Sequence, residues 1–171
     1  MARIQLSKNF YLDEFTRSQT AARFGIDNSV QPGSLEYNRL YYLCINILQP
    51  IRDALGPVTI LSGFRCLLLN KKIGGSQNSQ HTFGLAADFV VPGYTTLEVV
   101  QWCKENLKNF DQLIHEFGEW VHISGVFDGT PPRREVLTAI KIPRKLRKPK
   151  TVYLLGAYSM AEAHNIYQEA A

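Results

Sequence analysis

The chain has 171 residues, of which 45% are hydrophobic and 11% aromatic, so it can bury the core of one domain; a disordered or collagen-like protein is excluded. No apolar run approaches the roughly 18 residues of a membrane-spanning helix, and the first ten residues lack the apolar segment of a signal peptide. The formal net charge is +4, but residues 141–150 carry six basic side chains and no acidic one, which leaves −2 for the remainder. We expect a monomer made in a cytoplasm, with a local basic strip.

The cysteines do not predict cross-links or a metal site. Cys44, Cys66 and Cys103 are widely spaced and odd in number, which argues against a disulfide framework. None of them belongs to a Cys-x-x-Cys pair. Cys44 and Cys103 fall at apolar positions of predicted helices, where we expect them to be buried.

The first half of the chain is predicted to be mainly helical. Ser34 is a suitable N-cap for a helix whose apolar residues recur at helical spacing over residues 37–55. Gly56 ends this helix, and Pro50 is expected to kink it. The other predicted elements of this half are a helical turn over residues 11–16, a strand over 58–62 and a short helix over 66–72.

The second half is predicted to consist mainly of strands. The expected strands cover residues 85–91, 112–117, 120–124 and 151–155, and the expected helices cover residues 96–107 and 159–170. Gly118-Glu119, between the second and third of these strands, is typical of a hairpin turn. Because strands and helices do not alternate regularly, the predicted fold class is α+β, with a mostly antiparallel sheet flanked by helices.

Two short stretches contain the residue types of a hydrolytic zinc centre. His81 lies just before a predicted strand and Asp88 lies on it, and His122 lies on a later strand. Two imidazoles and one carboxylate leave an open position for water on zinc, and a further carboxylate is needed as the base. Glu119, three residues before His122, can supply that carboxylate. Residues three apart on an ideal strand face opposite ways, so Glu119 shares the site only if Gly118 turns it out of the strand.

These residues carry a resemblance to a known family. The chain resembles the M15 family of zinc D-Ala-D-Ala peptidases, in particular its phage-encoded members that act on peptidoglycan. The similarity runs from about residue 11 to residue 139. The family signature S-x-H-x-x-G-x-A-x-D followed by E-x-x-H is present as Ser79, His81, Gly84, Ala86, Asp88, Glu119 and His122, and Ser62-Gly63-Phe64-Arg65 resembles the segment that precedes it. Cys66 departs from the Ser that relatives often carry, and the tail from residue 141 has no clear counterpart.

The resemblance implies roles for particular residues. It implies Zn²⁺ held by His81, Asp88 and His122, Glu119 as general base, and Arg65 as an electrostatic stabiliser of the transition state. From their positions near the site, the predicted substrate-binding residues are Ser79, His115 and Trp120. The resemblance also implies the fold shared by these peptidases and the hedgehog signalling domain, so we expect a zinc peptidase domain over residues 1–140 and a basic strip with a C-terminal strand and helix over residues 141–171.

The expected function is a zinc-dependent peptidase that hydrolyses peptidoglycan stem peptides at a D-Ala-containing bond, as in a phage endolysin. Such an enzyme is made in the host cytoplasm and acts on the cell wall in the periplasm after release, or is carried in the virion. Two alternatives stay open: an L-alanyl-D-glutamate endopeptidase of the same fold, and a non-catalytic zinc-containing wall-binding or phage structural protein. The strip 141–150 is either a solvated linker or a binding segment for anionic cell-envelope polymers.

Overall fold

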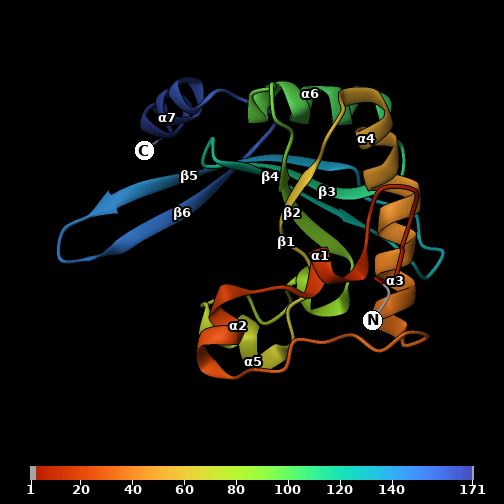
Figure 1. The fold of residues 1–171 in the computed structure, drawn as a ribbon. Coiled ribbons are helices and arrows are strands. Elements are labelled where there is room, and N and C mark those ends of the chain that lie inside the picture. The colour runs from red at the N-terminus through yellow and green to blue at the C-terminus, as the bar shows by residue number, and fades with distance from the viewer. Residues whose placement is uncertain (1–2, 171) are drawn as a thin grey trace.

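A six-stranded sheet in the order β1-β2-β4-β3-β5-β6 forms the centre of the molecule, with helices on both of its faces (Figure 1). The computed structural model describes residues 3–170. The strands are β1 (Thr59–Ser62), β2 (Ala86–Val90), β3 (Phe110–Glu116), β4 (Trp120–Gly125), β5 (Glu135–Arg144) and β6 (Arg147–Leu155). The helices are α1 (Leu12–Thr16), α2 (Gln19–Phe24), α3 (Leu35–Leu43), α4 (Gln49–Leu55), α5 (Leu67–Lys72), α6 (Thr96–Asn106) and α7 (Met160–Glu169). The predicted α+β class with a mostly antiparallel sheet is confirmed.

The long helix predicted before Gly56 is divided into α3 and α4 by a π-helical segment, Cys44–Leu48. The Ser34 side chain accepts a hydrogen bond from the Tyr37 amide and caps α3, as predicted. Pro50 has no amide proton to donate to the preceding turn, and the widened π-helical turn just before it accommodates the missing hydrogen bond. One face of the helix is fully buried and supplies much of the core, through Leu40, Leu43, Cys44, Ile47, Leu48 and Ile51.

The central strands divide their side chains between the core and a second, functional face. Asp88 on β2 pairs with His122 on β4, which pairs with Ile114 on β3, so these three side chains share one face of the sheet. The alternate residues on these strands face the core and are fully buried, among them Phe89, Val121, Ile123 and Leu113. The sheet is therefore a platform that holds an aspartate and a histidine side by side above a packed apolar layer.

The basic strip lies in a β-hairpin, and the linker interpretation of residues 141–150 was wrong. β5 runs parallel to β3 and pairs with β6, and the far half of this hairpin extends away from the body (Figure 1). β5 was not predicted, and β6 begins four residues before the predicted strand 151–155. The expected domain boundary after residue 140 falls inside β5. Within residues 3–170, no helix combines the length and apolar character needed to cross a bilayer.

Candidate metal centre and active site

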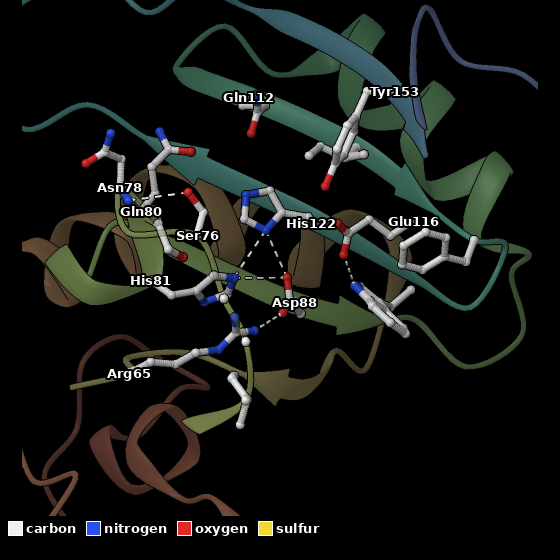
Figure 2. A pocket seen from close by; sticks show the side chains of 17 residues that line it. Arg65, Ser76, Asn78, Gln80, His81, Asp88, Gln112, Glu116, His122 and Tyr153 are labelled. Carbon is white, nitrogen blue, oxygen red and sulfur yellow. Dashed lines mark hydrogen bonds and ion pairs between the residues drawn. The ribbon is translucent and has the colours of Figure 1, made fainter. Parts of the chain in front are cut away.

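His81, Asp88 and His122 come together on the functional face of the sheet (Figure 2). Oδ1 of Asp88 lies 3.1 Å from Nε2 of His81 and 2.9 Å from Nδ1 of His122, and the two imidazole nitrogens are 3.2 Å apart. All three residues are buried. One atom from each residue thus points to a common position, which is the arrangement a tetrahedral metal ion needs from three protein ligands.

The orientation of His81 is fixed by the backbone around it. Its Nδ1 donates a hydrogen bond to the Gly63 carbonyl at 2.7 Å, which leaves Nε2 with a free electron pair toward Asp88 and His122. The residue lies in a 3-10 turn, Gln80–Phe83, that ends at Gly84 with a φ of +72°. A Cβ at Gly84 would lie 2.8 Å from the carbonyl oxygen of Glu36, so this close approach requires glycine. Burial lowers the pKa of His81, which favours the neutral, ligating form.

Arg65 holds the second oxygen of Asp88. Its Nη2 lies 2.5 Å from Oδ2 of Asp88, and its Nε donates to the Ser62 hydroxyl at 2.8 Å. The carboxylate is therefore ionised and oriented. Arg65, predicted as a transition-state stabiliser, contacts a candidate ligand directly in this structure.

The carboxylate that faces this cluster belongs to Glu116 and not to Glu119. Glu116, at the end of β3, lines the recess above the cluster and accepts a hydrogen bond from Nε1 of Trp120 (Figure 2). Glu119 lies on the turn with 60% of its side chain exposed, and Oε1 of Glu119 is 3.9 Å from the Lys141 ammonium. The structure therefore does not bring Glu119 to the candidate ligands. Burial and the charge of Asp88 raise the pKa of Glu116, as suits an acid–base group.

The cluster forms one wall of an open recess of about 510 Å³. A second hollow of about 420 Å³ adjoins it, and Arg65, Ile73, Asp88 and Trp120 line both. Besides the cluster, the side chains that line the first recess include Ser76, Asn78, Ser79, Gln80, Gln112, Glu116 and Tyr153. A buried metal-ligating group beside an open, polar recess has the form of a hydrolytic site.

Comparison with known proteins agrees with this geometry. A family model described as Peptidase M15 matches residues 8–124, more than half of the chain. The chain belongs to the Peptidase M15 family. This membership and the His–Asp–His donor set imply Zn²⁺ as the cofactor. A 43-residue stretch is 46% identical to the zinc D-Ala-D-Ala carboxypeptidase of Streptomyces albus G; it covers 24% of this chain and only 17% of that enzyme.

Two of the three predicted substrate-binding residues of this M15 peptidase lie at the recess, and the third does not. Ser79 and Trp120 both line the recess. His115 lies on the opposite face of β3, where Nε2 is 2.8 Å from the Thr96 hydroxyl and Nδ1 donates to the Tyr158 carbonyl. The structure thus places His115 in the packing between β3, α6 and the segment before α7, away from the candidate site.

The sequence did not single out Glu116, Gln112 or Tyr153 as site residues. Glu116 and Gln112 are even-numbered residues of β3 and share the face of Ile114, which pairs with His122. Once this register is known, strand alternation identifies both. Tyr153 lies outside the 8–124 span that matches the M15 family, so no motif pointed to it.

Proposed function

We propose that this M15 peptidase is a zinc enzyme that hydrolyses peptidoglycan stem peptides at a D-Ala-containing bond. The observation that carries the proposal is the buried His81–Asp88–His122 group at an open recess, with the carboxylate of Glu116 facing it. The carboxypeptidase from Streptomyces albus G, to which part of the chain is similar, supports the substrate class.

His81, Asp88 and His122 would hold the zinc ion, and their chemistry fits it. Neutral imidazole nitrogens and a carboxylate oxygen are usual zinc ligands. The hydrogen bond from His81 to Gly63 and the ion pair from Arg65 to Asp88 orient two of the three ligands, as supporting contacts do in zinc sites. Bound zinc supplies a Lewis acid that polarises the scissile carbonyl and acidifies the attacking water.

Glu116 is the general base in this proposal. Its carboxylate takes a proton from the water that attacks the carbonyl carbon, and delivers it to the amine nitrogen as the C–N bond breaks. Trp120 orients the carboxylate through its indole N–H, while burial keeps the group basic enough to accept the proton. Glu119, the base implied by the family resemblance, is the alternative, and it would need to move its exposed side chain from Lys141 into the recess.

The recess and the adjoining hollow share four lining residues, Arg65, Ile73, Asp88 and Trp120. A peptide that extends from the recess into the hollow would have residues bound on both sides of the scissile bond. This supports an endopeptidase acting on cross-linked or extended stem peptides over an enzyme that removes only a terminal residue. An L-alanyl-D-glutamate endopeptidase would use the same two-sided cleft.

Digestion of purified peptidoglycan tests the function directly. The zinc-loaded protein should release fragments whose masses identify the bond: free D-Ala from a carboxypeptidase, cross-link cleavage at D-Ala from an endopeptidase, or a stem peptide cut after L-Ala. His122→Ala is the matched control and should release nothing. No release by the wild-type protein with zinc bound would favour the non-catalytic wall-binding alternative.

The basic strip, residues 141–150, has a separate proposed role. We propose that residues 141–150 bind anionic polymers of the cell envelope, because nearly all of these residues are exposed and the segment lies on the part of the hairpin that extends from the body. The resemblance to phage-encoded members supports action in phage lysis or from a virion. Export of the protein to the periplasm of a test bacterium should then cause lysis, and His122→Ala should not.

A further inference from the structure

Tyr153 projects into the active-site recess from β6, outside the part of the chain that matches the family. It pairs with Ala139 on β5, and Ala139 pairs in turn with Glu116 on β3. Paired residues on neighbouring strands share a face, so Tyr153 lies on the same face as Glu116 and His122. Figure 2 shows its hydroxyl group directed into the recess toward His122 and Glu116.

Ala139, which lies between Tyr153 and Glu116 in the sheet, is small enough to leave room for the Tyr153 ring. Two strand spacings separate the backbones of Tyr153 and Glu116, or roughly 10 Å, and a tyrosine side chain can cross most of that distance. Ala139 contributes only a methyl group on this face and is fully buried. The ring of Tyr153 can therefore lean across Ala139 toward the catalytic carboxylate, which a larger residue at position 139 would prevent.

Within residues 3–170 the hydroxyl of Tyr153 makes no hydrogen bond to the protein, whereas three neighbouring side chains already donate to other groups. Nε1 of Trp120 donates to Glu116, and Nε2 of Gln112 donates to Glu135 at 2.6 Å. Arg65 is directed at Asp88 and Ser62. Burial and the negative charges of Glu116 and Asp88 raise the pKa of Tyr153, so the phenol keeps its proton.

We propose that Tyr153 is a further catalytic residue, whose hydroxyl donates a hydrogen bond to the oxygen of the scissile carbonyl as negative charge develops there. This inference rests on the proposed peptidase function. It makes the β5–β6 hairpin a part of the active site and not an appendage to it. Glu116 accepts the proton of the water on one side of the carbonyl carbon, and Tyr153 stabilises the oxygen without giving up its own proton.

Removing the Tyr153 hydroxyl should lower kcat by less than the removal of a fully enclosed hydrogen-bond donor would. Removal of one enclosed oxyanion donor costs about 10²–10³-fold in kcat. Tyr153 is 52% exposed, so water can replace part of its hydrogen bond. We expect Tyr153→Phe to lower kcat by about 10–100-fold and to change KM by less than about threefold, since the interaction forms in the transition state.

The experiment compares Tyr153→Phe with Tyr94→Phe, a matched control on an exposed turn outside the recess. Each protein is assayed for kcat and KM on a soluble stem peptide, for zinc content, for thermal stability and for binding of a phosphinate pseudopeptide that mimics the tetrahedral oxyanion. Tyr153→Phe should keep its zinc and its stability, lose kcat, and bind the phosphinate at least about tenfold more weakly. Tyr94→Phe should match the wild type.

Two results would overturn the inference. If Tyr153→Phe binds the phosphinate and turns over peptide as the wild type does, the hydroxyl has no catalytic role, although the peptidase function stands. If the loss lies in KM alone with phosphinate affinity unchanged, Tyr153 only contacts the substrate in its ground state. Zinc-loaded wild-type protein that cleaves no stem peptide would instead remove the proposed function and this inference together.

Discussion

The choice between Glu116 and Glu119 as general base can be tested by two single substitutions. Glu116→Gln keeps the size of the side chain and its ability to accept the hydrogen bond from Trp120, but removes the negative charge. The candidate ligand group does not include Glu116, so zinc should stay bound. Loss of a positioned base lowers turnover by about 10²–10⁴-fold, equivalent to about 2.7–5.4 kcal/mol of transition-state stabilisation.

Glu119→Gln is the matched control. The side chain of Glu119 is 60% exposed, and its only ion pair within residues 3–170 is the 3.9 Å contact with Lys141. Exposed pairs of this kind contribute little to stability, so kcat and the melting temperature should both stay close to the wild-type values. Peptide release and metal content should be measured on the same samples of both variants. A normal Glu116→Gln enzyme beside an inactive, zinc-loaded Glu119→Gln enzyme would refute the geometric assignment and restore Glu119 as the base.

The pH dependence of kcat/KM gives an independent check on Glu116. Burial, then the charge of Asp88, raises the pKa of this carboxyl above the ordinary glutamate value. A base works only when deprotonated, so the activity of the zinc-loaded enzyme should rise with pH through the pKa of Glu116. The residual activity of Glu116→Gln should lack this acid limb. An acid limb that persists unchanged in this variant would assign the titration to another group.

His122→Ala should lose its zinc, as measured by metal analysis, and added zinc should no longer raise its melting temperature. For the wild-type protein, free zinc at 100 times the Kd raises the free energy of unfolding by about 2.7 kcal/mol. In Gly63→Ala the new Cβ would lie 2.7 Å from Phe15 backbone atoms, so the free energy of unfolding should fall by about 1–3 kcal/mol in denaturant titrations. The clash would also shift the Gly63 carbonyl that orients His81, so zinc binding should weaken about 10–100-fold. Asp111 forms an ion pair with Arg133 at 2.7 Å, and Asp111→Asn should lower the free energy of unfolding by about 1–2 kcal/mol at pH 7. Burial would raise the pKa of Asp111, but Arg133 lowers it in the folded state, so the difference in stability from the wild type should disappear as the pH falls below that pKa. Neutralising the six basic residues of 141–150 should reduce cosedimentation with purified anionic cell walls, most at low salt, while soluble-peptide turnover stays within about twofold.

The central part of the fold was predictable because its strands and helices have strong local signals. β2, β3 and β4 contain apolar residues and are bounded by turns, and Thr95 caps α6 through a capping box with Glu98. β5 and the first part of β6 lacked such a signal, because the charges and prolines of residues 141–150 are typical of a linker. The structure accommodates Pro143 at an irregularity in the β5–β6 register, between Ile142 and Arg144, and Pro149 on the edge strand β6, both places where a strand tolerates proline.

The candidate ligand group His81, Asp88 and His122 was predictable from its motif, whereas the position of the candidate base depends on the length of the loop between β3 and β4. A two-residue loop of Gly118 and Glu119 would pair Phe117 with Trp120, and would then set Glu116 opposite Val121, on the core face. In the structure the loop has one residue more: Phe117 joins it with a φ of +58°, and Glu116 pairs with Trp120. A shift of one residue in register exchanges the two faces of a strand. It therefore turns Glu116 toward His122, and the alternation from His122 back through Trp120 leaves Glu119 directed away from the candidate ligands.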